Sequence, residues 1–355
     1  MAPIILNPSP AGIQNLPNEH PEYELFRRIW DNWFSSDPLL PFTTSGSSGA
    51  PKEYHFNRNQ VRTSAQLTAS WLQAGPPLNW LLCLPISFVA GRMVLYRALI
   101  SNTPLQVLIP KAQPIEGPLL SNAVSLTPAM LAEALKSQTA ADALSKFQHI
   151  LLGGGQLNRQ LEMAIESWSP ILPQIWHTYG MTETLTHVGA RQVYPKKEIR
   201  FKPIDPSIQW NMNAQGLEIF HPKLQKEPIQ TSDAGEISNN GEFLWTGRMD
   251  FLLKVGGKKV WPEVLERKLI HEYDRRLPRF YFSGTPHDTL GHSLVLVFQE
   301  EPQEWEGLIA YIRKWHGAER PSQYCIRPQD FDTSKDKIKR QKTLAKEDLK
   351  PWPTR

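Results

Sequence analysis

Short apolar runs alternate with helical patterns along the first half of the chain, and this alternation constrains the fold more than any other feature. Each apolar run is bounded by turn residues, which is typical of a buried strand. Strands that alternate with helices favour α/β units on a largely parallel sheet, so we expect an α/β fold. The expected strands cover residues 80–84, 105–109, 123–126, 148–152 and 171–176, and the expected helices cover 22–34, 58–72, 93–100, 128–135 and 159–168.

The character of the sequence changes after about Val193. Short strand-like pieces then lie between turns, at 199–202, 208–211, 217–220, 235–237 and 242–245, and predict a small β subdomain. A compact α+β segment is expected from about Asp250 onwards. A chain of 355 residues suits one large and one smaller domain. We therefore expect a large domain over 1–249, with the β subdomain, and a small mobile C-terminal domain over 250–355.

Composition narrows the class of protein. Hydrophobic residues make up 40% of the chain and charged residues 21%, as in soluble globular proteins. The most apolar stretch, 78–100, contains a proline and two arginines, so no membrane span is expected. A formal charge of +4 is too mild to indicate nucleic acid, and none is expected as a partner. Cys83 and Cys325 lie far apart, which favours a reducing, cytoplasmic location.

A Gly/Ser loop runs from Thr44 to Lys52. Backbone N–H groups of such a loop can converge on an anion, with hydroxyls as further donors, and Gly46 and Gly49 permit the required backbone angles. Lys52 adds a mobile positive charge. The spacing differs from that of the P-loop, and a flexible surface loop stays an equal alternative.

A second polar segment, 178–184, follows the expected strand 171–176. The carboxyl ends of strands in open α/β sheets are where ligands bind. Tyr179 could pack on a flat base, Thr182 could donate to phosphate, and Glu183 could hold Mg²⁺. An ordinary turn with a capping threonine is the alternative.

Three further segments indicate a function only when they are considered together. Asp233 could accept hydrogen bonds from ribose hydroxyls and Arg248 could donate to the same sugar, although a structural turn and a surface ion pair explain both. Residues 254–263 form a glycine–lysine loop that, taken alone, favours a hairpin turn with solvated charges. Residues 333–340 taken alone are a solvated basic patch.

In this order, the motifs TSGSSGAPK, YGMTE, the Asp233 segment, GRMDFLLKVGGKKVWPEVLE and KDKIKR resemble those of the adenylate-forming superfamily, which contains acyl-CoA synthetases, luciferases and peptide-synthetase adenylation domains. The matches cover residues 44 to 340, and five ordered motifs are far more specific than one. TYGMTETLTH looks most like the o-succinylbenzoate–CoA ligases of menaquinone biosynthesis.

The resemblance implies an AMP-forming acid–CoA ligase that uses ATP, Mg²⁺ and coenzyme A on a small aromatic carboxylic acid. It leaves the oligomeric state open. The implied roles are ATP phosphates at Thr44, Ser45, Gly46, Ser47, Ser48, Gly49 and Lys52; adenine at Gly153, Gly154, Gly155, Gln156, Thr178, Tyr179 and Gly180; ribose at Asp233 and Arg248; Mg²⁺ at Glu183; catalysis at Lys337, Glu183 and Thr182; a hinge at Asp250; and a loop for the CoA step at Lys254, Gly256, Gly257 and Lys258.

The sequence also departs from the family pattern. Only 43 residues precede the Gly/Ser loop, so we expect a large domain that is shortened at its N-terminus. Asp336 replaces the usual glycine, which leaves Lys335 as an alternative to Lys337. The histidine expected near 85–91 is absent, and Phe88 lies nearest to its role.

The acyl-binding residues are the least constrained. Phe88, Arg92 and His187 are expected to bind the acyl group. A second carboxylate on the acid would need a cationic partner, for which Arg92, Arg97 and His187 are candidates. A surface role for Arg92, a structural role for Arg97 and a core role for His187 stay open. Two rival functions also stay open: loading of a carrier protein, and nucleotide binding without catalysis.

Overall fold

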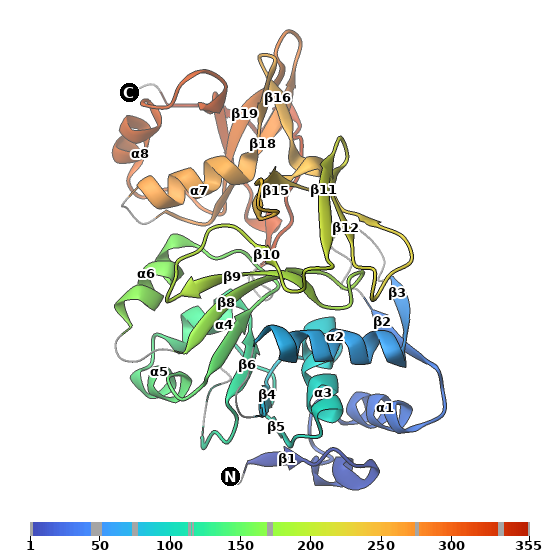
Figure 1. Cartoon of the computed structure of the whole chain (residues 1–355). Coiled ribbons are helices and arrows are strands. Elements are labelled where there is room, and N and C mark those ends of the chain that lie inside the picture. Colours follow the sequence, from blue (N-terminus) through green and yellow to red (C-terminus); the bar gives the residue numbers. More distant parts are fainter. Residues whose placement is uncertain are drawn as a thin grey trace. The chain divides into compact units, whose positions relative to one another are not determined.

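The computed structural model describes residues 3–43, 52–72, 77–112, 115, 117–168, 173–273, 277–332 and 337–353. The chain divides into two compact units, shown with the whole chain in Figure 1. Unit 1 comprises 1–210, 219–229 and 238–243, and unit 2 comprises 211–218, 230–237 and 244–355. The expected domain border between 249 and 250 stays a prediction.

An eight-stranded sheet forms the centre of unit 1, in the order β1-β5-β4-β6-β7-β8-β9-β10. Neighbouring strands from β5 to β8 are parallel, whereas β1, β9 and β10 pair antiparallel at the two edges. The predicted α/β fold is confirmed. The strands are β1 (Ile4–Leu6), β4 (Trp80–Leu82), β5 (Leu105–Val107), β6 (Ala123–Leu126), β7 (His149–Leu152), β8 (Gln174–Gly180), β9 (His187–Tyr194) and β10 (Lys202–Pro203).

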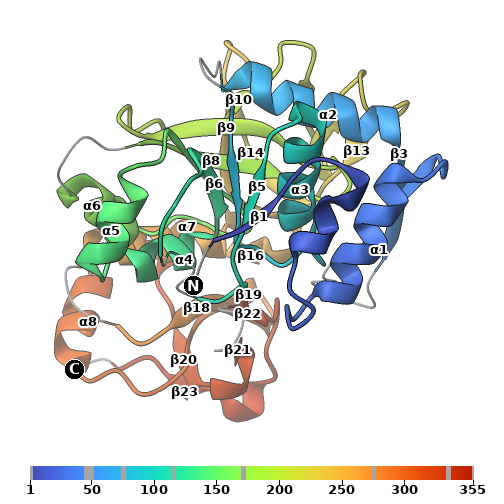
Figure 2. The same ribbon diagram turned by 90° about the horizontal axis from the view of Figure 1, so that it is seen from below.

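Helices cover both faces of this sheet. Successive strand residues point to opposite faces, so Trp80 packs in one apolar cluster and Leu81 in the other. Figure 2 shows α1, α2 and α3 on one side of the strands and α4, α5 and α6 on the other. The helices are α1 (Tyr23–Phe34), α2 (Arg58–Trp71), α3 (Val89–Ser101), α4 (Pro128–Ala134), α5 (Gln138–Leu144) and α6 (Arg159–Ser167).

Three elements near the expected site differ from the sequence expectation. Strand β8 continues to Gly180, beyond the expected end at 176, because its polar last residues pair with β9. Strand β9 itself was not expected. The chain on either side of the Gly/Ser loop forms an antiparallel hairpin of β2 (Leu39–Thr43) and β3 (Glu53–Asn57), which was also not expected.

Four of the five expected β subdomain pieces are found as short strands, whereas the piece expected at 199–202 is replaced by β10 at the edge of the large sheet. The subdomain strands are β11 (Gln209–Asn213), β12 (Gly216–Phe220) and β13 (Ile229–Gln230), which was not expected, in one sheet, and β14 (Asp233–Ile237) with β15 (Phe243–Arg248) in another. The short 3₁₀ helices are η1 (Pro10–Asn15), η2 (Met249–Phe251), η3 (Gly317–Glu319), η4 (Pro328–Asp330) and η5 (Lys346–Asp348).

The C-terminal part of unit 2 is an α+β structure, as expected. Its six-stranded sheet packs on two helices through a core that includes Leu265, Phe282, Leu296 and Leu308. Among the described residues, none of the helices has the length and apolar character needed to cross a bilayer. The elements are β16 (Leu253–Val255), β17 (Lys258–Val260), α7 (Pro262–Glu272), β18 (Phe280–His287), β19 (Gly291–Phe298), α8 (Trp305–Ile312), β20 (Gln323–Ile326), β23 (Lys350–Pro351) and the separate pair β21 (Phe331–Asp332) and β22 (Lys337–Ile338).

Candidate active site

The glycine segment 153–156 follows β7 directly and lies against the end of β8. The Thr178 hydroxyl donates to the carbonyl of Leu152 at 2.9 Å. A Cβ on Gly153 would lie 3.1 Å from that hydroxyl oxygen, and Gly154 has a φ of +76°. Glycine therefore lets this segment turn close to Thr178, at the carboxyl edge of the parallel strands.

His177, which the sequence did not single out, holds the same segment from β8. Arg191 Nε donates to its Nδ1 at 3.2 Å, so Nε2 carries the proton and donates to the carbonyl of Gly155 at 3.0 Å. Burial, and secondly the charge of Arg191, lower the pKa of His177 to about 3. The ring is therefore a neutral, fixed donor at pH 7. Its place directly before the 178–184 segment was the signal that could have indicated it.

Glu183 receives a hydrogen bond from a residue that the sequence did not indicate. Tyr54 on β3 donates its hydroxyl to Glu183 Oε1 at 2.9 Å, across 129 residues of sequence. Burial, and secondly this bond, raise the pKa of Tyr54. The Glu183 carboxylate stays partly exposed and is a hard oxygen ligand of the kind that Mg²⁺ takes.

The Gly/Ser loop itself is only partly described. Thr44, Ser45, Gly46, Ser47, Ser48 and Gly49 lie outside the described residues. Lys52 is described and exposed. Strand β3 begins at Glu53, and the Tyr54–Glu183 bond therefore joins the carboxyl side of this loop to the turn that follows β8.

The turn from β8 to β9 is closely packed. The Thr184 hydroxyl donates to the carbonyl of Thr186 at 2.6 Å and accepts from the N–H of Met181 at 3.0 Å. A Cβ on Gly180 would overlap the backbone of Thr186 and His187, so only glycine fits there. Thr182 and Thr184 are buried and Tyr179 packs against Phe201 and Phe243.

Arg92 is buried, so the surface role considered for it is wrong. Its Nε donates to the carbonyl of Ile86 at 3.0 Å, its Nη1 donates to the carbonyl of Pro41, and its guanidinium lies over the ring of Phe42. Burial lowers its pKa. Groups of the chain itself therefore already use the hydrogen-bonding capacity of the Arg92 guanidinium. Phe88, directly before α3, is 46% exposed.

Arg97 is equally buried but less fully bonded. Its Nη2 donates to the Thr186 hydroxyl at 2.8 Å, and its guanidinium lies over Trp80. Its Nε has no hydrogen-bond partner, and no carboxylate among the described residues pairs with it. Burial lowers the pKa of Arg97 to about 9, which leaves it cationic at pH 7.

His187 lies beside this arginine, at the start of β9. Thr68 Oγ1 is 3.1 Å from its Nε2, and Trp71 packs edge-on against its ring. Burial, and secondly the charge of Arg97, lower the pKa of His187 well below its ordinary value. The ring is therefore neutral, so Arg97 is the positive charge of this cluster.

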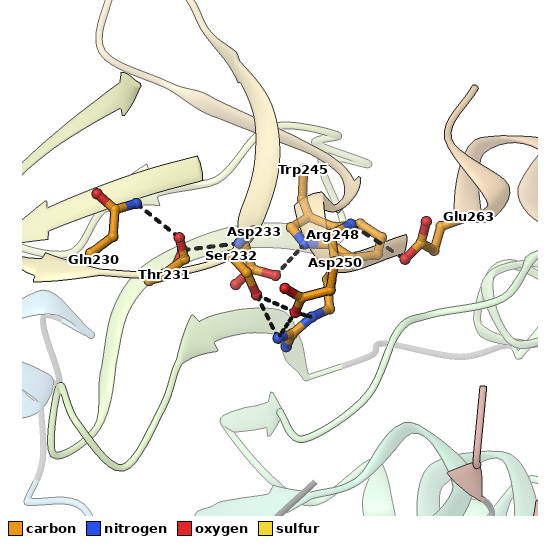
Figure 3. A network of polar contacts seen from close by, with 8 residues as sticks. All are labelled: Gln230, Thr231, Ser232, Asp233, Trp245, Arg248, Asp250 and Glu263. Carbon is orange, nitrogen blue, oxygen red and sulfur yellow. Dashed lines mark hydrogen bonds and ion pairs between the residues drawn. The ribbon is translucent and has the colours of Figure 1, made fainter. Parts of the chain in front are cut away.

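The expected ribose and hinge residues lie in one polar network of unit 2 (Figure 3). Asp233 Oδ1 accepts from Trp245 Nε1 at 3.0 Å. Arg248 Nη2 donates to Asp250 Oδ2 at 2.7 Å and to the Ser232 hydroxyl, which itself donates to the same Asp250 oxygen at 2.8 Å. The structure thus brings Asp233, Arg248 and Asp250 together.

The expected loop for the CoA step is a tight hairpin between β16 and β17. Gly256 and Gly257 have φ of +57° and +78°, as a two-residue hairpin turn requires, and the Gly256 N–H donates to the carbonyl of Leu290 at 2.9 Å. Lys254 and Lys258 are exposed on it.

The expected catalytic lysine begins a two-residue strand. The backbone of Lys337 in β22 pairs with Asp332 of β21. The side chain of Lys337, and residues 333–336 with the alternative Lys335, lie outside the described residues.

Comparison with known proteins identifies the family. The family model "AMP-binding enzyme" matches residues 19–247. The 2-succinylbenzoate–CoA ligase of Salmonella typhimurium is 30% identical over 241 residues, which are 63% of this chain and 50% of that enzyme. The Escherichia coli K12 enzyme of that name is 26% identical over 328 residues, 88% of this chain and 68% of that enzyme.

Solved structures show the same fold. The acyl-CoA synthetase (AMP-forming)/AMP-acid ligase II-like protein from Dyadobacter fermentans has a TM-score of 0.63 and 27% identity, and the match covers 94% of this chain and 97% of that one. The o-succinylbenzoate CoA synthetase from Bacillus subtilis with its acyl-adenylate intermediate has a TM-score of 0.69 at 18% identity, covering 84% and 67%.

The chain spans about half the length of the first curated relatives that it matches. The predicted membership of the adenylate-forming superfamily is nonetheless confirmed, because the family model covers well over half of this chain. The chain belongs to the AMP-binding enzyme family.

Proposed function

We propose that this chain is an AMP-forming acid–CoA ligase that acts on o-succinylbenzoate or a closely similar aromatic acid with two carboxylates. The family and the names of its relatives support the reaction class. The single observation that carries the substrate class is Arg97, a buried cation with an unpartnered Nε.

A buried arginine usually has an anionic partner, because an unpaired charge in the protein interior is costly. Arg97 has none among the described residues, and the neighbouring His187 is neutral. The second carboxylate of the acid would supply the missing negative charge. Arg92 is a weaker candidate, since carbonyl groups and the Phe42 ring already occupy it.

In the first half-reaction, a carboxylate oxygen of the acid attacks the α-phosphorus of ATP. The bond from that phosphorus to the bridging oxygen breaks, and pyrophosphate leaves. Negative charge builds up on the phosphoryl oxygens, so fixed cations and donors lower the barrier. We assign the α-phosphate to Lys337, the leaving phosphates to Thr44, Ser45, Ser47 and Lys52, and Mg²⁺ to Glu183 with Thr182 nearby; bound Mg²⁺ would neutralise phosphate charge.

The nucleoside part of ATP is assigned to two further groups of residues. Gly153 to Gln156 and Thr178 to Gly180 would line adenine, with His177 fixing the glycine segment. Asp233 and Arg248 would bind the ribose.

In the second half-reaction, the sulfur of coenzyme A attacks the acyl carbon and the thiol proton passes to solvent. The bond from that carbon to the AMP oxygen breaks, so a thioester and AMP form. We propose that a rotation at Asp250 replaces Lys337 with the hairpin that carries Lys254, Gly256, Gly257 and Lys258.

The test is a panel of carboxylic acids, including o-succinylbenzoate, with ATP, Mg²⁺ and coenzyme A. We expect AMP release and a thioester with o-succinylbenzoate and little with monocarboxylic analogues. An adenylate without any thioester would instead support loading of a carrier protein. No pyrophosphate exchange with any acid would overturn the proposed reaction.

Lys337→Ala tests the assignment of the catalytic lysine. Acid-dependent ATP–pyrophosphate exchange should nearly vanish, because the charge beside the α-phosphate is lost. Thioester formation from pre-made acyl-adenylate should persist, because that step does not use the lysine. Equal loss of both half-reactions would contradict the assignment.

A further inference from the structure

Within the part of the chain that the structure describes, the backbone that carries Lys337 has little strand pairing. Strands β21 and β22 form only the pairs Phe331↔Ile338 and Asp332↔Lys337. An isolated two-stranded hairpin is marginally stable in water even when it is longer than this. Other contacts must therefore fix the position of this strand.

On one side, the segment is hydrogen-bonded to the backbone of Asp330, a residue whose buried carboxylate is itself fixed. Asp330, 3% exposed, accepts from the Tyr281 hydroxyl at 2.6 Å and from Arg327 Nε at 2.8 Å. Its backbone carbonyl accepts from the N–H of Lys339 at 2.7 Å. The anchor lies two residues beyond Lys337 on the same chain segment.

On the other side, Arg340 is held by a glutamate of α7. Its two terminal nitrogens donate to Glu266 Oε1 and Oε2 at 2.5 and 2.6 Å, a bidentate pair. Glu266 Oε1 also accepts from the N–H of Phe282, and Arg340 donates to the carbonyl of the same residue at 3.1 Å. Its guanidinium lies over the rings of Phe251 and Tyr281.

This ion pair is shielded from solvent. The side chains of Arg340 and Glu266 are 11% and 13% exposed, whereas the next ion pair of α7, Lys268 with Glu319, is 32% and 49% exposed. A bidentate pair in such surroundings fixes geometry, and loss of one partner leaves a buried charge unpaired.

We propose that Glu266, acting through Arg340, is a positioning residue that fixes the strand of Lys337 for acyl-adenylate formation. The proposal rests on the proposed function, in which Lys337 serves the first half-reaction only. Glu266 lies on a rigid helix of the same unit, so it holds the strand in register without touching substrate. Small displacements of a catalytic group are sufficient to slow a reaction greatly.

The test compares Glu266→Gln with Glu319→Gln in the full chain. Glu266→Gln should lower acid-dependent pyrophosphate exchange roughly ten- to hundredfold, because the lysine strand is no longer fixed. Thioester formation from pre-made acyl-adenylate should stay near the wild-type rate, a separation that a general loss of stability would not give. Glu319→Gln removes an exposed pair from the same helix and should change neither rate.

Amide hydrogen exchange supplies a readout that does not depend on activity. The N–H of Lys339, and that of Leu344, which donates to the carbonyl of Gly284 at 2.8 Å, should exchange about tenfold faster or more in Glu266→Gln. Both should exchange at the wild-type rate in Glu319→Gln. If Glu266→Gln does not fold, Arg340→Lys replaces it, since it keeps the charge but loses the second donor. Unchanged amide exchange, or equal loss of both half-reactions, would overturn the proposal. A wild-type chain without pyrophosphate exchange would overturn the proposed function alone, because amide exchange still tests the positioning.

Discussion

Two buried arginines on α3 show how residues of one type differ in what they can bind. Arg92 donates to two carbonyl groups and lies over Phe42, so its hydrogen-bonding capacity serves the fold. Arg97 donates to Thr186 and keeps an unpartnered Nε. The sequence instead favoured Arg92 as the acyl-binding residue. Both arginines lie in one apolar run, and nothing in that run shows which partners each of them has.

Arg97→Met should raise the Michaelis constant for the acid by about ten- to hundredfold, since a hydrogen bond to a charged group contributes roughly 1.5–3 kcal/mol. The constant for ATP should not change. Steady-state kinetics with both substrates checks this. Arg92→Met serves as the comparison: it should lower thermal stability by leaving carbonyls unpaired, without a selective effect on the acid. A selective effect in Arg92→Met alone would refute the assignment.

At the scale of elements, the turn between β8 and β9 determines where several site residues lie. Gly180 ends β8 with a register shift against β9, and a side chain there would overlap the backbone of Thr186 and His187. Arg97 donates to Thr186, and Tyr54 donates to Glu183 within the same turn. The close approach of the two backbones at Gly180 therefore helps to fix Thr186, the partner of Arg97, and Glu183, the partner of Tyr54.

Gly180→Ala should reduce the free energy of unfolding by about 1–3 kcal/mol, the usual cost of overpacking. Gly155→Ala is the matched control, because its Cβ would meet only Pro128 at an ordinary 3.6 Å. That variant should be unchanged or up to about 1 kcal/mol more stable. Urea unfolding of the two variants measures the difference, and equal losses would show that close packing at Gly180 is not the cause.

The same elements show what could be predicted from sequence. Strands β4, β6 and β7 and helices α2 and α6 follow from apolar periodicity, and short motifs indicate Glu183 and Asp233 as candidates. Strand β9 and the β2–β3 hairpin do not, because their pairing depends on partners rather than on period. Tyr54 and His177 were missed for a related reason: their roles come from contacts with distant residues.

At the scale of the whole molecule, the segments assigned to the two half-reactions belong to one unit. Lys337 and the 254–258 hairpin both lie in unit 2, and both follow the Ser232–Arg248–Asp250 network in the sequence. If each step uses one of these segments at the same substrate, the part of the chain after Asp250 must take two arrangements. The backbone at Asp250 is where we place that change.

Asp250→Pro tests whether the backbone at this residue must change between the two half-reactions. Proline fixes φ at about −65° and restricts the preceding residue. Asp250→Ala is its control: both variants lose the carboxylate that Arg248 and Ser232 contact, but only the proline restricts the backbone. We expect both to keep at least one half-reaction, measured as pyrophosphate exchange and as thioester formation from acyl-adenylate. Overall turnover from acid, ATP and coenzyme A should fall much further in Asp250→Pro, because completing both steps requires the backbone to change. Equal turnover in the two variants would mean that the carboxylate contacts matter at this position and backbone freedom does not.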